Sequence, residues 1–142
     1  MLDTNVLVAI LAFADPALEP LRAAWRRGDL VPLTDDACLA EIARVLDAPA
    51  LAARKAVAQA ALEDYLRACE RVADGNPGRL PACRDRDDQK LLALAARGRA
   101  DALATRDKAL LELARRVPFA IVAPERLAAT IAVGSTRIEP AA

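Results

Sequence analysis

The sequence contains no histidine, and this absence removes several kinds of chemistry at once. Imidazole cannot act as a general base, and a zinc site with histidine ligands cannot form. The three cysteines include no C-x-x-C pair and are too few for a zinc site made of thiolates alone. Because their number is odd, reduced thiols in a cytoplasmic protein are the better interpretation of Cys38, Cys69 and Cys83.

Aromatic residues are also scarce, since the chain has only Phe13, Trp25, Tyr65 and Phe119. These are too few for a surface on which single-stranded bases stack. The 20 basic and 20 acidic residues give a formal net charge of zero, so no global field would attract nucleic acid. If a polyanion binds to this protein, metal ions or local arginines must hold it.

Long apolar runs are missing as well. The longest, residues 6–14, falls far below the ~20 residues that span a bilayer. The start of the chain carries Asp3 and no basic leader, so we expect no signal peptide and no membrane association. A length of 142 residues with 55% hydrophobic residues suits a single core. We expect one domain over residues 1–132 and a flexible tail over residues 133–142.

Short segments typical of β-strands alternate with helical ones along the chain. Such an order requires crossover connections, so we expect an α/β fold with three layers, in which helices cover both faces of a central, mainly parallel sheet. Turn residues predict a loop over residues 74–81. The expected strands are residues 1–2, 30–33, 102–105 and 119–122. The expected helices are about 5–14, 17–27, 34–46, 50–72 (as one or two), 88–98, 108–116 and 124–132.

One acidic pattern occurs three times. DTNVLVAI begins at Asp3, DQKLLALA at Asp88 and DKALLELA at Asp107, and each has aliphatic residues at +3, +4, +6 and +7. On a helix these positions share the face of the starting residue, so each Asp heads the face that packs on the sheet. Asp87 is rotated by about 100° from Asp88, and Asp85 precedes the predicted helix. Each repeated Asp also lies near the carboxyl end of a candidate strand, where open parallel sheets bind ligands.

Three carboxylates at one edge would repel one another unless a cation neutralised them. Oxygen ligands with open positions suit Mg²⁺ or Mn²⁺, so we predict a metal site at Asp3, Asp88 and Asp107. Glu41 lies on the polar rim of its helix, where it could lean over the same cleft. The structural alternative is that these Asp residues only cap helices, because Asp is a favoured N-cap residue. The pattern by itself does not decide between the two.

Four stretches, in order along the chain, resemble the PIN-domain family: LDTNVLV, TDDACLAEIARVLDAP, CRDRDDQKLLALA and ADALATRDKALL. The resemblance covers most of the chain and is nearest to the bacterial toxins of toxin–antitoxin modules. It implies a PIN-like α/β/α fold, a ribonuclease that depends on Mg²⁺ or Mn²⁺, an RNA substrate and a cognate antitoxin, and it allows a homodimer. The implied catalytic acids are Asp3, Glu41, Asp88 and Asp107. The supporting residues are Asn5 and Thr105, with Asp87 and Asp85 as caps and nearby charges.

Two alternatives stay open at this point. LDTNV loosely resembles the nucleophile motif of haloacid-dehalogenase-like phosphatases, in which Asp3 would attack the phosphate. Asn5 stands where that motif has its second Asp, and the chain is short for that family. The other alternative is a PIN fold without activity that binds a protein partner.

Overall fold

The computed structural model describes residues 1–134 and residue 138, so most of the tail expected over residues 133–142 lies outside the described residues. Three 3₁₀ segments accompany the regular elements: η1 (Pro16–Leu18), η2 (Pro49–Arg54) and η3 (Arg86–Asp88). The helices and strands in chain order are α1 (Thr4–Leu11), α2 (Glu19–Arg27), β1 (Leu33–Thr34), α3 (Asp36–Leu46), α4 (Lys55–Ala68), β2 (Glu70–Arg71), α5 (Gln89–Arg97), β3 (Ala102–Ala104), α6 (Lys108–Leu111), β4 (Ala120–Val122) and α7 (Pro124–Ala132).

The strands pair in parallel, which confirms the expected α/β class. β3 pairs with β4, with Leu103 opposite Ile121, and Leu2 forms a parallel bridge to Ala104. β1 pairs with β2, with Leu33 opposite Glu70. The backbone N–H of Asp3 donates to the carbonyl of Ala104 at 3.0 Å. The first acid of the repeated pattern is therefore fixed beside the carboxyl end of β3.

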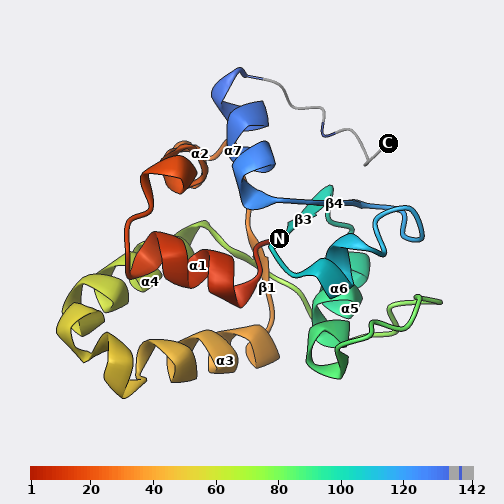
Figure 1. Ribbon diagram of the computed structural model, residues 1–142, viewed down its shortest axis with the longest axis horizontal. Helices are drawn as coiled ribbons and strands as arrows, with labels where there is room; N and C mark the ends of the chain where they lie inside the picture. Colours follow the sequence, from red (N-terminus) through yellow and green to blue (C-terminus); the bar gives the residue numbers. More distant parts are fainter. Residues whose placement is uncertain (135–137, 139–142) are drawn as a thin grey trace.

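Side chains of the central strands alternate between two cores, as the period of two in a β-strand requires. Ala102 and Ala104 face a cluster built mainly from α1, α2, α3, α4 and α7, whereas Leu103 and Ile121 face a cluster built mainly from α5 and α6. Figure 1 shows α5 and α6 on one side of the strands, and α1, α3 and α4 on the other. The fold thus has the three layers that we expected.

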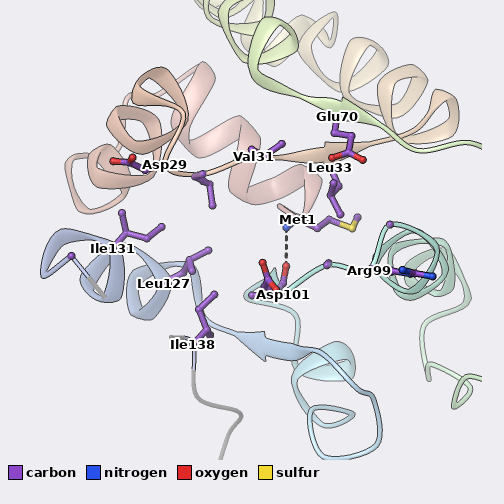
Figure 2. A pocket seen from close by; sticks show the side chains of 15 residues that line it. Met1, Asp29, Val31, Leu33, Glu70, Arg99, Asp101, Leu127, Ile131 and Ile138 are labelled. Atoms are coloured by element: carbon purple, nitrogen blue, oxygen red, sulfur yellow. Dashed lines mark hydrogen bonds between the residues drawn. The ribbon is translucent and has the colours of Figure 1, made fainter. Parts of the chain in front are cut away.

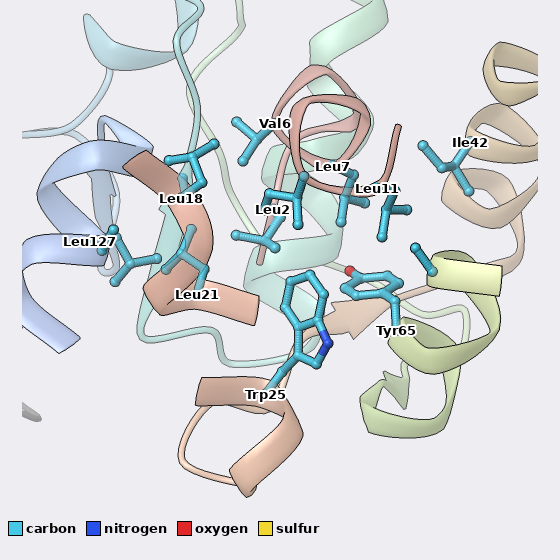
Figure 3. Packing of buried hydrophobic residues seen from close by; sticks show 14 of the residues in the cluster. Leu2, Val6, Leu7, Leu11, Leu18, Leu21, Trp25, Ile42, Tyr65 and Leu127 are labelled. Carbon is cyan, nitrogen blue, oxygen red and sulfur yellow. The ribbon is translucent and has the colours of Figure 1, made fainter. Parts of the chain in front are cut away.

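The larger core contains a pair of buried aromatic side chains. The rings of Trp25 and Tyr65 meet edge to face with centroids 5.1 Å apart, close to Leu2 and Leu21 (Figure 3). Aromatic pairs prefer this geometry over a face-to-face arrangement. The contact joins α2 to α4 next to Leu2. It therefore supports the chain directly before Asp3.

A groove of about 590 Å³ is lined by residues from both strand pairs. Figure 2 shows Met1, Leu33 and Leu127 among the side chains around it, and the dashed line is the hydrogen bond from the backbone nitrogen of Met1 to the carbonyl of Ala102, 2.8 Å long. Leu33, Glu70 and Ala102 of the groove are the first residues of β1, β2 and β3, whereas Leu127 belongs to α7. The acids stand at the opposite, carboxyl end, so this groove is not the acidic site.

Several boundaries differ from the sequence prediction. The helix expected over residues 50–72 is divided into η2 and α4, and its end is the strand β2. Both residues of β2 are exposed and charged, so no apolar pattern marks the strand. The strand expected around Pro32 begins only at Leu33, and the carbonyl of Pro32 accepts from the N–H of Glu70 at 2.8 Å. α6 ends at Leu111 instead of residue 116, because the chain continues in tighter turns.

Candidate metal centre

Asp3 occupies a buried position at the start of α1. It stands at the N-cap of that helix but its side chain makes no capping hydrogen bond. Instead, Oδ2 accepts a hydrogen bond of 2.7 Å from the hydroxyl of Thr105, and both side chains are shielded from solvent. Thr105 directly follows β3, and its N–H donates to the carbonyl of Val122 on β4 at 3.0 Å. The sheet therefore fixes the residue that holds Asp3.

Asp107 is connected to the same threonine. Its backbone N–H donates to Oγ1 of Thr105 at 3.0 Å, and its Oδ1 accepts from the N–H of Ala109 at 2.8 Å as the cap of α6. The Thr105 hydroxyl thus donates to one acid and accepts from the backbone of another. Two acids that are 104 positions apart in the sequence are held at one place by a single buried side chain.

Asp85 and Asp88 come from η3, the turn that leads into α5. Asp85 caps this turn, because its Oδ1 accepts from the N–H of Asp87 at 3.0 Å. Asp88 makes no capping bond for α5, and its Oδ2 is buried without a hydrogen-bond donor. The preceding loop is held by Gln89, which accepts from the N–H of Cys83 at 2.6 Å and donates to the carbonyl of Pro81 at 3.1 Å.

Within the part of the chain that the structure describes, one group of acids is close enough to hold a metal ion. Asp85, Asp88 and Asp107 each offer one carboxylate oxygen, and these atoms all lie within 4.8 Å of one another. The predicted trio differs from this group in one member, since the structure gathers Asp85 where the sequence suggested Asp3. Asp3 is nevertheless near, because its negative charge acts on Asp88 and that of Asp107 acts on Asp3.

The protonation of these acids reflects their crowding. Burial, a hydrogen bond with Asp107 and the charges of Asp107, Asp85 and Asp3 raise the pKa of Asp88 to about 7. The bond with Asp88 and the amide of Ala109 lower the pKa of Asp107. Burial also raises the pKa of Asp3, although the hydroxyl of Thr105 opposes the rise. Two carboxyl groups can hydrogen-bond only when one of them holds a proton, and the opposite shifts of the two pKa values assign that proton to Asp88.

The donor set fits a hard divalent cation. Carboxylate oxygens are the ligands that Mg²⁺ and Mn²⁺ prefer, and a cation would take the place of the proton on Asp88. The buried Oδ2 of Asp88 has no donor from the protein, which leaves it available as a ligand. A carboxylate that served only as a helix cap would accept an N–H, as Asp107 and Asp85 do.

Sequence reasoning assigned Asp85 to a cap and a nearby charge, and the cap is what the structure contains. Its proximity to Asp88 was missed for a geometric reason. Asp85 was set aside because it precedes the predicted helix, and in the structure it is the N-cap of the 3₁₀ turn formed by residues 86–88. From this cap position the carboxylate of Asp85 lies within 4.8 Å of that of Asp88.

The other predicted residues lie around this group. Glu41 on α3 accepts a hydrogen bond of 2.8 Å from the hydroxyl of Thr4 and pairs with Lys90 of α5 at 3.0 Å. Asn5 is exposed on the first turn of α1, and Asp87 is exposed in η3. Glu41 is therefore linked to the residue after Asp3, while Asn5 and Asp87 face solvent. The catalytic roles assigned to these residues remain predictions.

An α/β domain with acids gathered at the carboxyl end of parallel strands defines the class of protein as a candidate metal-dependent hydrolase. A family model, described as PIN domain, matches residues 1–109. The chain belongs to the PIN-domain family, which confirms the resemblance seen in the sequence. PIN domains are generally nucleases that use divalent metal ions, and this favours the nuclease over the phosphatase alternative. Searches of curated proteins and of solved structures gave no significant match.

None of the helices within the described residues combines the length and the apolar character that crossing a lipid bilayer requires. The cysteines Cys38, Cys69 and Cys83 are all free thiols.

Proposed function

We propose that this protein is a metal-dependent endoribonuclease, the toxin of a toxin–antitoxin module, that hydrolyses RNA phosphodiesters in the cytoplasm. The observation that carries the proposal is the buried Oδ2 of Asp88, which lacks a donor and lies in a group of converging carboxylates within a PIN fold. Crowding of this kind is electrostatically costly, and a bound cation removes the cost.

Asp88 and Asp107 would hold Mg²⁺ or Mn²⁺, with Asp3 and Asp85 as further oxygen donors. Such an ion lowers the pKa of bound water and stabilises negative charge on a phosphate during in-line displacement. The protein keeps its acids in place for this task, since Thr105 orients Asp3 and the amide of Ala109 orients Asp107. Because the chain has no histidine, imidazole cannot provide a route without metal.

RNA would reach the acids past three nearby arginines that can contact its backbone. Arg86 is exposed in η3, while Arg84 pairs with Glu112 at 3.3 Å and Arg106 pairs with Glu125. A cognate antitoxin would act at the same place, by inserting an arginine or lysine that pairs with the carboxylates. We expect co-expression of such an inhibitor to relieve toxicity and to yield a stable complex.

The proposal is tested by metal removal. We expect EDTA to abolish cleavage of a single-stranded RNA pool by the purified protein, and added Mn²⁺ or Mg²⁺ to restore it. Asp88→Asn should be inactive in Mn²⁺, whereas Asp87→Asn, which changes an exposed acid of the same turn, should retain substantial activity. Full activity in EDTA would refute the metal-dependent mechanism.

A further inference from the structure

An ion pair joins two helices beside the acids. Nζ of Lys90, in the first turn of α5, lies 3.0 Å from Oε2 of Glu41 on α3. The same oxygen accepts the hydroxyl of Thr4 at 2.8 Å. Thr4 directly follows Asp3, and Lys90 is two positions after Asp88. Glu41 therefore links the start of α1, which carries Asp3, to the start of α5, which follows Asp88.

Glu41 is committed to these two partners. Burial alone would raise its pKa, but hydrogen bonds from Lys90 and Thr4 outweigh burial and lower the pKa, so Glu41 is ionised. The described acids that converge within 4.8 Å are Asp85, Asp88 and Asp107, and Glu41 is not one of them. Its charge is balanced by a lysine, whereas Asp88 has an oxygen without any donor.

Lys90 occupies a position that does not favour its helix. A cation in the first turn opposes the positive end of the helix dipole. Its side chain is 37% exposed, and an ion pair with this much solvent access contributes little to stability. The ammonium has three N–H donors, and the pair with Glu41 uses one of them. Donors remain for a ligand, and a phosphate is the anion that would arrive at a nuclease site.

We propose that Lys90 binds an RNA phosphate next to the metal centre, and that Glu41 is a positioning residue that holds Lys90 there instead of a metal ligand. This inference rests on the proposed function and deepens it, because it assigns a contact with the RNA backbone to a specific side chain. It also reassigns Glu41, for which the family resemblance implied a place among the catalytic acids.

The test compares Lys90→Gln, Lys90→Arg and Glu41→Gln with the parent. Lys55→Gln is the matched control, because Lys55 also forms a lysine–carboxylate pair, with Asp47 at 2.6 Å, but in α4. Binding of a labelled single-stranded RNA is measured by fluorescence anisotropy in Ca²⁺ over a range of salt concentrations. Mn²⁺ binding is measured by calorimetry without RNA, and thermal melting verifies that each variant is folded.

We expect Lys90→Gln to weaken RNA binding about tenfold, as loss of a charged hydrogen bond does. The slope of log affinity against log salt should fall by about 0.7, which corresponds to one phosphate contact on a single strand. Lys90→Arg should restore the slope, and Lys55→Gln should match the parent. Glu41→Gln should keep the slope, weaken RNA binding by a smaller factor and leave Mn²⁺ affinity unchanged.

Two results would overturn the inference: a Lys90→Gln variant that binds RNA with the affinity and slope of the parent, or a Glu41→Gln variant that loses Mn²⁺. A parent that does not bind RNA would overturn it as well. Failure of the proposed function is a different result, in which RNA binding depends on Lys90 but the parent cleaves no RNA in Mn²⁺. The same measurements therefore separate the two.

Discussion

Replacement of Asp88 by asparagine is expected to stabilise the metal-free protein while it abolishes activity. Burial and the neighbouring acids Asp107, Asp85 and Asp3 raise the pKa of Asp88, and once Asp88 loses its proton it repels Asp107. The asparagine introduced by Asp88→Asn carries an amide that donates to Asp107 at every pH, as the proton of Asp88 does in the parent. The variant therefore keeps the favourable contact and removes the repulsion.

The size of the effect follows from the pKa of Asp88. A rise from 3.8 to about 7 corresponds to ~4 kcal/mol at ~1.4 kcal/mol per pH unit. Asp88 is only partly buried, so solvent screens the repulsion and we expect about 1–2 kcal/mol. The native state binds the proton more tightly than the unfolded state between pH 3.8 and about 7. Stability of the parent therefore decreases as the pH rises through this window, and it levels off above it. Asp107 has a lowered pKa, so its titration falls below the window.

The assay is urea unfolding in EDTA at pH 5 and pH 8. The advantage of Asp88→Asn over the parent should be largest at pH 8 and clearly smaller at pH 5, where the folded parent still holds its proton although the unfolded chain has already lost it. Asp87→Asn is the control, since this exposed neighbour should show the same small difference at both pH values. An Asp88→Asn variant that is less stable than the parent at pH 8 would refute the crowding argument. Mn²⁺ should stabilise the parent more than the variant.

Two further predictions concern the scaffold. Gly98→Ala should destabilise the fold by about 1–3 kcal/mol in urea unfolding, because the new Cβ would lie 2.7 Å from Cδ1 of Leu33. Gly75→Ala is the control and should be neutral, because a Cβ at Gly75 meets open space. Equal stability of the two variants would contradict the close packing of α5 on β1. Thr105→Val should lower the free energy of unfolding by about 1–3 kcal/mol, because it leaves Asp3 buried without its hydrogen-bond donor. Thr105→Ser should recover most of this stability. A Thr105→Val variant as stable as the parent would show that the hydroxyl is dispensable.

The order of the elements could be predicted because the chain marks their ends chemically. Gly28 ends α2 in the left-handed conformation with φ of 82°, and Pro124 begins α7. These ends agree with the helices expected over residues 17–27 and 124–132. β2 could not be predicted, since it consists of Glu70 and Arg71 and is defined only by its pairing with β1. A strand of two exposed charged residues carries no local signal.

The sequence pattern selected two of the three acids that the structure gathers. The repeated pattern identified Asp88 and Asp107, which the structure brings together, because helix starts after strands converge at one edge of a parallel sheet. Asp85 was not selected because it precedes the predicted helix, and its approach to Asp88 depends on how the turn before α5 folds. The pairing of Glu41 with Lys90 depends on how α3 and α5 approach each other, which no local pattern contains.

The position of Asp3 relative to Asp107 is set by the side chain of Thr105, which the sheet holds in place. Both acids depend on Thr105, whose hydroxyl donates to one and accepts from the N–H of the other, and whose own N–H is fixed on Val122 of β4. Asp85 and Asp88 come instead from the turn η3, where Asp85 accepts from the N–H of Asp87 and Oδ2 of Asp88 is buried without a donor. One half of the site is thus held by the sheet and the other half by the turn before α5. Because the acids of the two halves come from separate elements, the packing of α5 on the strands decides whether their carboxylates converge on one cation.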